Sequence, residues 1–127
     1  MATERTEAVQ AHLRLLVEQV EGGLKALPLP DEPAELYAPV RYVLKGGGKR
    51  MRPVLLLLTA EAYGGAEARA RAMPAALAVE VFHNFTLVHD DIMDAAPERR
   101  GRPTIHIRWD DATAILVGDL LMGLSYD

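Results

Sequence analysis

The sequence predicts an all-α fold of about five helices. Apolar residues recur at steps of three and four through most of the chain, and glycine or proline clusters separate these runs. The one alternating stretch, TIHIRW (residues 104–109), has no partner strand elsewhere in the chain, so we read it as a loop.

The first two helices are predicted from this periodicity. A first apolar stripe is followed by the breaking sequence PLPDEP (residues 28–33). A second run covers residues 36–44, in which Pro39 either kinks the helix or marks its start. The residues of the first stripe are Val9, Leu13, Leu16, Val20, Leu24 and Leu27.

The later elements follow a glycine loop, GGGKRMRP (residues 46–53), whose proline suits the first turn of a third helix. Gly64–Gly65 predicts the end of that helix, and a short helical piece is expected over 67–72. Pro74 is predicted to open a long helix to about Asp94, and AAPERRGRP (95–103) to be a loop. Asp110 or Asp111 can cap a last helix.

Composition excludes several classes of protein. The 127 residues suit one small domain, and the absence of cysteine rules out disulfides, thiolate metal sites and cysteine nucleophiles. A net charge of −4 argues against nucleic-acid binding, which favours a basic face. The longest apolar run, PVLLLLTA, is too short to cross a bilayer, and the polar N-terminus is unlike a targeting peptide. We therefore expect a soluble, cytoplasmic protein.

The segment DDIMD (residues 90–94) is a candidate metal site. Asp90 and Asp94 are four residues apart, so their carboxylates lie on one helix face. Asp91, the third candidate ligand, is rotated by about 100° from Asp90 around the helix axis. The neighbouring carboxylates repel each other, and the helix dipole disfavours negative charge at a helix C-terminus. A bound cation would relieve both effects. Mg²⁺ suits such a site, because it uses one or two carboxylates and completes its shell with water and phosphate oxygens. Alone, the segment could equally be a solvated acidic helix end.

Two basic clusters are candidate anion sites. Lys49, Arg50 and Arg52 precede a helix N-terminus, where backbone N–H groups, dipole and cations converge, although no strand precedes them as in a Walker A loop. Arg99 and Arg100 follow the carboxylates and could bind phosphate in bidentate fashion. Each cluster alone could be a solvated basic loop.

A histidine joins these clusters. His83 lies seven residues before Asp90, on nearly the same helix face. Alone, it could be a polar residue at the edge of the core. Taken together, the two basic clusters, the carboxylates and this histidine describe a site for polyphosphate and magnesium.

These motifs resemble those of the trans-isoprenyl (polyprenyl) diphosphate synthases. GGGKRMRP is similar to the family's G-G-K-R-x-R-P region, DDIMD to its first D-D-x-x-D motif, and RRGRPT to the R-R-G-x-P-T that follows. The resemblance implies a helical fold around a deep cavity, normally in a homodimer. It also implies magnesium-dependent condensation of isopentenyl diphosphate with an allylic diphosphate.

The resemblance also implies residue roles, carried over by position. The isopentenyl diphosphate would be held by Lys49, Arg52, His83 and Arg100. Asp90 and Asp94 would hold Mg²⁺ on the allylic diphosphate, which Arg99 would contact. The residues expected to act in catalysis are Lys49, Asp90, Asp94 and Arg99.

Phe85 bears on product length. In the resembled family, the residues four and five before the first aspartate shape the cavity floor, and here these are Thr86 and Phe85. A bulky ring at the second position resembles short-chain enzymes, which favours farnesyl or geranylgeranyl diphosphate as product. The alternative is that Phe85 is an ordinary core residue.

The resemblance also sets expectations for the whole chain. Residues 1–127 match the N-terminal portion of one synthase domain, without a second aspartate-rich motif, and the last helix reaches Asp127 with no stop signal. We expect little prenyltransferase activity from these residues alone, and self-association through exposed apolar surface. Two rival interpretations are a class I terpene synthase, which lacks GGGKRMRP, and a non-catalytic subunit that partners a catalytic chain.

Overall fold

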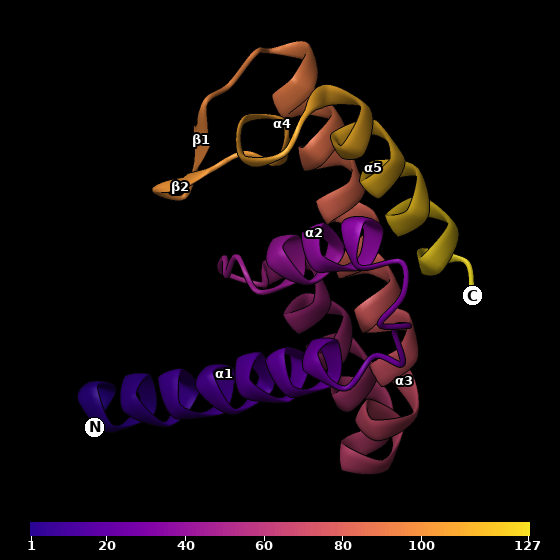
Figure 1. Ribbon diagram of the computed structural model, residues 1–127. Coiled ribbons are helices and arrows are strands. Elements are labelled where there is room, and N and C mark those ends of the chain that lie inside the picture. The colour runs from indigo at the N-terminus through magenta and orange to yellow at the C-terminus, as the bar shows by residue number, and fades with distance from the viewer.

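The computed structural model describes residues 1–127 and contains five helices and one small hairpin (Figure 1). In chain order the elements are α1 (Ala2–Lys25), α2 (Ala34–Leu44), α3 (Met51–Met93), β1 (Glu98–Arg99), β2 (Arg102–Pro103), α4 (Ile105–Arg108) and α5 (Asp111–Ser125). The predicted all-α class with about five helices is confirmed. None of these helices combines the length and apolar character required to cross a bilayer.

Helix α3 folds back on itself at Gly65. This residue has φ 72° and ψ −164°, a backbone conformation that glycine adopts without a side-chain clash. The two arms lie side by side (Figure 1), with Glu61 paired to Arg69 near the bend and Arg52 paired to His83 further away. The predicted interruption at Gly64–Gly65 is therefore confirmed.

The predicted helix start at Pro74 is wrong. The second arm is helical directly after Gly65, so the separate piece expected over 67–72 and the long helix are continuous. Pro74 lies inside this arm. A proline removes only one backbone N–H from a helix, so the rest of the hydrogen-bond ladder persists on both sides of it.

The segment between α3 and α5 contains more regular structure than expected. β1 and β2 form an antiparallel hairpin joined by Arg100 and Gly101, both with positive φ, as in a type I′ turn. The stretch read as a loop at 104–109 contains the helical turn α4, because Ile105 is buried there while Ile107 is exposed. Residues two apart lie on nearly opposite sides of a helix, so the burial of Ile105 and the exposure of Ile107 fit a helical turn, whereas a strand would place both on one face.

The core joins all five helices. Its buried members are Leu16, Val20, Leu24, Val40, Leu44, Val54, Leu57, Ala76, Val81, Val88, Ile105, Ala114, Val117 and Leu121. The predicted stripe of α1 faces this core from Leu13 onward, but Val9 is 58% exposed because the first half of α1 extends away from the other helices (Figure 1). Pro39 lies buried inside α2.

Helix α5 packs against the end of α3 through a glycine. Asp110 caps α5 by accepting a hydrogen bond from the Thr113 N–H at 2.6 Å, which decides between the two predicted caps. Gly118 is buried, and a Cβ at this position would overlap the ring of His89 on α3. The absence of a side chain at Gly118 therefore sets how closely the two helices approach.

Replacing Gly118 with alanine is expected to destabilise the chain by about 1–3 kcal/mol, the usual cost of overpacking, and to lower the melting temperature by several degrees. Gly123→Ala is the matched control, since an added Cβ there meets nothing within 4 Å and alanine favours the same helix. Thermal unfolding followed by circular dichroism measures both variants. Equal melting temperatures for the two would contradict this account of the contact.

Candidate active site

A hollow at the start of α3 is lined by basic side chains from three parts of the chain. Lys49 and Arg52 come from the glycine loop and the first arm of α3, His83 from the second arm, and Arg100 from the hairpin turn. Gly48, Arg50, Met51 and Glu80 complete the lining. The residues expected to hold isopentenyl diphosphate therefore share one hollow.

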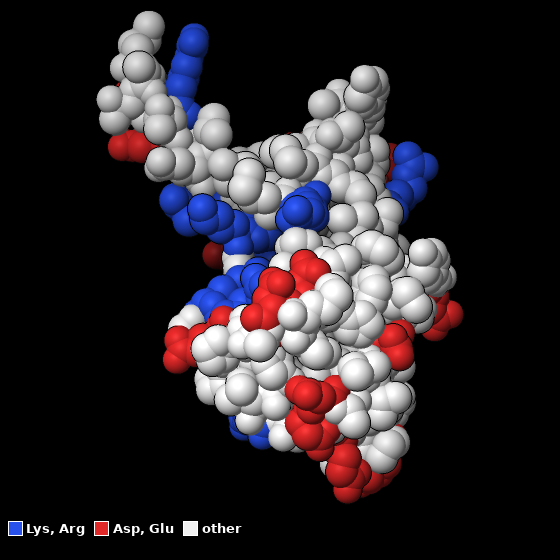
Figure 2. Space-filling view, turned by 90° about the horizontal axis from the view of Figure 1, so that it is seen from above, with Lys and Arg blue, Asp and Glu red and all other residues white.

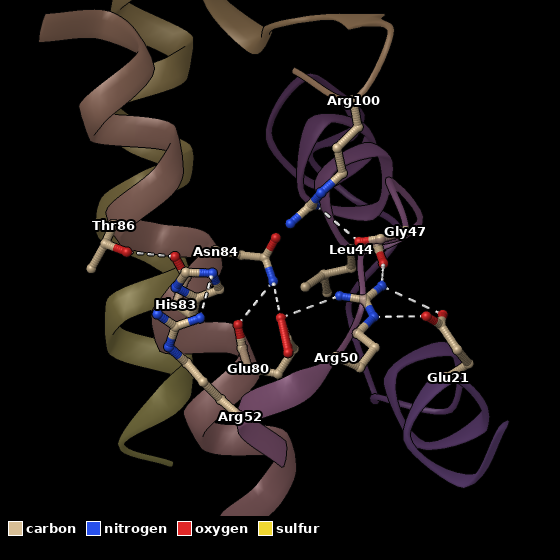
Figure 3. Close-up of polar contacts among 10 residues, drawn as sticks. All are labelled: Glu21, Leu44, Gly47, Arg50, Arg52, Glu80, His83, Asn84, Thr86 and Arg100. Atoms are coloured by element: carbon tan, nitrogen blue, oxygen red, sulfur yellow. Dashed lines mark hydrogen bonds and ion pairs between the residues drawn. The ribbon is translucent and has the colours of Figure 1, made fainter. Parts of the chain in front are cut away.

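Arg52 and His83 are directly bonded across the two arms (Figure 3). Arg52 Nη1 lies 3.2 Å from His83 Nε2, and because a guanidinium can only donate, the imidazole nitrogen accepts. Partial burial lowers the pKa of His83 from its ordinary value of 6.5, and the positive charge of Arg52 lowers it further. His83 is consequently neutral at pH 7. The charges of Arg50 and Glu80 offset each other, so the net positive charge of the hollow comes from Lys49, Arg52 and Arg100.

Titration of His83 is expected to report on this hollow. Its pKa should lie below 6.5 in the free chain, and should rise when pyrophosphate binds or when Arg52 is replaced by alanine. Since the pKa is lower in the folded than in the unfolded chain, this group favours folding at neutral pH and opposes it as pH falls below about 6.5. NMR titration of the imidazole signals, with His106 as internal control, measures these shifts. A His83 pKa unaffected by Arg52→Ala would contradict the assignment.

The hairpin is bound to the glycine loop and to the end of α2. Arg100 Nη1 donates to the Gly47 carbonyl at 2.9 Å, and its guanidinium covers Gly48 so closely that a Cβ there would lie 2.9 Å from Arg100 Cζ. Tyr42 donates its hydroxyl to the Pro103 carbonyl at 2.7 Å, while the Arg102 guanidinium lies 3.9 Å from the centre of the Tyr42 ring. These contacts join the two basic motifs, which are about fifty residues apart in sequence.

The three aspartates at the end of α3 have two different environments. Asp91 is buried and accepts two hydrogen bonds from Arg99, at 2.8 Å from Nε and 2.7 Å from Nη2. This bidentate bond raises the pKa of Arg99, and Asp90 and Asp94 add to the effect. Asp90 and Asp94 themselves are exposed. On the face seen in Figure 2, Lys and Arg side chains gather beside a group of acidic ones.

The exposed pair suits a magnesium ion that is shared with a ligand. No three or more His, Cys, Asp or Glu side chains converge on a common point that could enclose a metal. Mg²⁺ does not need such an enclosure, because one or two carboxylates with water and phosphate oxygens complete its shell. Asp90 and Asp94 supply that donor set, whereas the oxygens of Asp91 are already bonded to Arg99.

Comparison with known proteins identifies the family. The model of the polyprenyl synthetase family matches residues 33–127. The chain belongs to the polyprenyl synthetase family. It is 47% identical over 108 residues to a geranylgeranyl diphosphate synthase of Methanosarcina mazei, covering 85% of this chain and 33% of the relative. It is 51% identical over 85 residues to a geranylfarnesyl diphosphate synthase of Aeropyrum pernix, covering 67% of this chain and 27% of the relative.

Solved structures agree with this assignment. The geranylgeranyl pyrophosphate synthetase of Pyrococcus horikoshii superposes with a TM-score of 0.85 at 39% identity, covering 96% of this chain and 37% of that protein. A second geranylgeranyl pyrophosphate synthase has the same TM-score of 0.85 at 53% identity, covering 90% of this chain and 34% of that protein. The chain thus has the helical fold of these synthases and spans about a third of their length.

Within this polyprenyl synthetase chain, Phe85 lies apart from the cationic hollow. Its ring is half-buried against the core, with ring centroids 5.2 Å from Phe82 and 4.9 Å from His89. A second hollow shares Arg52 and His83 with the first and is otherwise lined by Phe82, Thr86, Tyr126, Ala78, Val79 and Ser125. Thr86, one of the two residues expected at the cavity floor, borders this hollow, whereas Phe85 does not.

Sequence reasoning missed the buried member of the basic cluster. Arg50 is 2% exposed and binds Glu21 on α1 and Glu80 on α3, instead of facing a ligand (Figure 3). One signal was present, since Glu80 is a lone acidic residue inside the apolar run AALAVEVF. A charge in such a run needs a buried partner, but the sequence does not say which cation supplies it.

Proposed function

We propose that this chain carries the isopentenyl diphosphate site and the first metal-binding face of a prenyltransferase that condenses isopentenyl diphosphate with an allylic diphosphate. The observation that supports the proposal best is the single hollow lined by Lys49, Arg52, His83 and Arg100. Four groups that recognise phosphate come together there from separate parts of the sequence. The names of the relatives, which are geranylgeranyl and geranylfarnesyl diphosphate synthases, point to the same chemistry.

In the proposed mechanism, Lys49, Arg52 and Arg100 bind the diphosphate of isopentenyl diphosphate, and His83 accepts a hydrogen bond from Arg52 and so helps to orient that guanidinium. The allylic C–O bond breaks and pyrophosphate leaves with the electron pair. The double bond of isopentenyl diphosphate then attacks the allylic cation and forms the new C–C bond, and the resulting cation loses a proton to the released pyrophosphate. No nucleophilic side chain is required, so the residues act by positioning and by charge.

The allylic diphosphate is assigned to the acidic end of α3. Asp90 and Asp94 would hold Mg²⁺, which supplies positive charge that stabilises the departing pyrophosphate. Arg99 would contact the same diphosphate, and its bidentate bond to Asp91 keeps its guanidinium in a fixed orientation. In this arrangement Asp91 orients Arg99 and is not the main metal ligand, although the sequence included it among the candidates.

A short-chain product, farnesyl or geranylgeranyl diphosphate, is part of the proposal. It rests on Phe85, the aromatic residue five positions before the first aspartate, and on the similarity to a geranylgeranyl diphosphate synthase. A cytoplasmic location and a homo-oligomeric parent enzyme also belong to it. Because the chain spans about a third of its relatives, we expect little product from these residues alone.

Calorimetric titration with isopentenyl diphosphate tests the proposal. Saturable binding that competes with pyrophosphate is the expected result. A class I terpene synthase uses only an allylic diphosphate, so failure to bind isopentenyl diphosphate would favour that alternative. Co-purification with a longer synthase chain, without binding of either diphosphate, would favour a non-catalytic subunit.

Self-association is a further expectation. Several large apolar side chains on α4, on α5 and at the C-cap of α5 face solvent, namely Ile107, Ile115, Leu116, Met122 and Tyr126. Clusters of this kind promote association. Sedimentation velocity measures it, and a single monomeric species across the concentration range would contradict the expectation.

A further inference from the structure

Arg50 differs from the cations on either side of it. Lys49 and Arg52 are exposed, while the side chain of Arg50 is fully buried. We infer that Arg50 is a positioning residue for the diphosphate hollow, and that its guanidinium holds the backbone between Lys49 and Arg52 in the conformation that places both at the hollow. This inference rests on the proposed function, because it concerns how that same site is shaped.

The guanidinium of Arg50 joins three elements at one point (Figure 3). Nε donates to Glu21 Oε1 of α1 at 2.7 Å, and Nη2 donates to the Leu44 carbonyl at the end of α2 at 2.9 Å. Nη1 lies 3.4 Å from Glu80 Oε1 on the second arm of α3 and makes no hydrogen bond. The fork geometry of arginine is suited to several acceptors in different directions, which a lysine ammonium could not match.

The backbone at Arg50 needs such support. Its φ of 54° and ψ of 34° are left-handed, a conformation that side-chain-bearing residues disfavour. The preceding Gly47 and Gly48 also have positive φ and contribute no side chain that could hold the loop. On the other side of the loop, Arg100 binds the Gly47 carbonyl. The glycine loop is therefore held between two arginines that both belong to the lining of the hollow, of which Arg50 is buried and Arg100 is exposed.

Glu80 gives Arg50 a second effect on the hollow. This carboxylate is 3% exposed and belongs to the lining, where a negative charge would repel a diphosphate. The positive charge of Arg50 lies next to it and offsets that repulsion. Asn84 Nδ2 also donates a hydrogen bond to the backbone carbonyl of Glu80 at 2.8 Å.

The test uses Glu21, which binds Arg50 but does not line the hollow. Removing a carboxylate makes the chain more positive, so electrostatics alone predicts that Glu21→Ala binds pyrophosphate more tightly. If Arg50 acts by position, Glu21→Ala instead loosens the loop and weakens binding, by about threefold or more. Arg50→Met is expected to weaken it by about tenfold or more, since two carboxylates are then left without their cation. Glu18→Ala, exposed and one turn earlier on α1, is the matched control.

Pyrophosphate affinity of each folded variant is measured by calorimetry, and the Lys49 and Arg52 amide signals are followed by NMR. The inference is supported if Glu21→Ala binds pyrophosphate more weakly and shifts these amide signals, while Glu18→Ala does neither. Affinity for Glu21→Ala equal to or tighter than wild type overturns it, and this comparison decides the question even if Arg50→Met does not fold. No binding by the wild-type chain would instead overturn the proposed function, and the inference with it.

Discussion

Replacing Lys49 or Arg52 with alanine is expected to weaken pyrophosphate binding by about 10- to 150-fold. In the proposed site each residue would supply a charge-assisted hydrogen bond to the ligand, and such bonds contribute about 1.5–3 kcal/mol, which corresponds to that change in affinity. Both side chains are exposed, so neither variant removes a core contact. Calorimetric titration of each folded variant with pyrophosphate gives the change directly.

The control for this result is Lys25→Ala, which removes the same charge at the end of α1, outside the hollow. At moderate salt it is expected to change the affinity only slightly, because distant surface charges are screened. If Lys25→Ala weakened pyrophosphate binding as much as Lys49→Ala, the affinity would depend only on the net charge of the chain. That result would contradict a specific binding site in the hollow. The double variant Lys49→Ala/Arg52→Ala should also lose more than either single one.

Replacing Asp90 or Asp94 with asparagine is expected to weaken divalent metal binding in the presence of pyrophosphate by at least about 10- to 100-fold. Replacing a residue that only hydrogen-bonds to a metal ligand commonly lowers metal affinity by this amount. Here the proposed ligand itself is replaced, so the loss should be at least as large. Asparagine keeps the size of the side chain, and both positions are exposed, so the fold should be unaffected. Mn²⁺ can replace Mg²⁺ as the probe, since it broadens NMR signals close to its binding site.

The third aspartate separates a metal effect from a structural one. Asp91→Asn leaves Arg99 without its charged partner, so it is expected to lower thermal stability, whereas the Asp90 and Asp94 variants should melt like wild type. Asp111→Asn, at the start of α5, is the surface control. Broadening near Asp90 that persists at the same Mn²⁺ concentration in both the Asp90→Asn and Asp94→Asn variants would show that neither carboxylate is needed to hold the metal.

The fold class and most of the helices could be predicted from local sequence. The apolar period of α1, the bend at Gly65 and the Asp110 cap all depend on residues within a few positions of one another. The helix start at Pro74 was mispredicted because a proline removes only one backbone N–H. Its presence does not determine whether a helix begins at that residue or continues through it. The turn α4 was missed because its formation depends on burial of Ile105, which is a tertiary effect.

By itself, the sequence determined the chemical inventory of this protein: two basic clusters, the DDIMD carboxylates and a histidine on helices, in an order that matches the polyprenyl synthetase family. Only the tertiary structure decided how these groups are arranged and paired. It joined Lys49, Arg52, His83 and Arg100 around one hollow, bonded Asp91 to Arg99 and buried Arg50 against Glu21. The physical reason is that residue type and spacing fix local direction along a helix, whereas burial and pairing depend on which distant segment packs opposite.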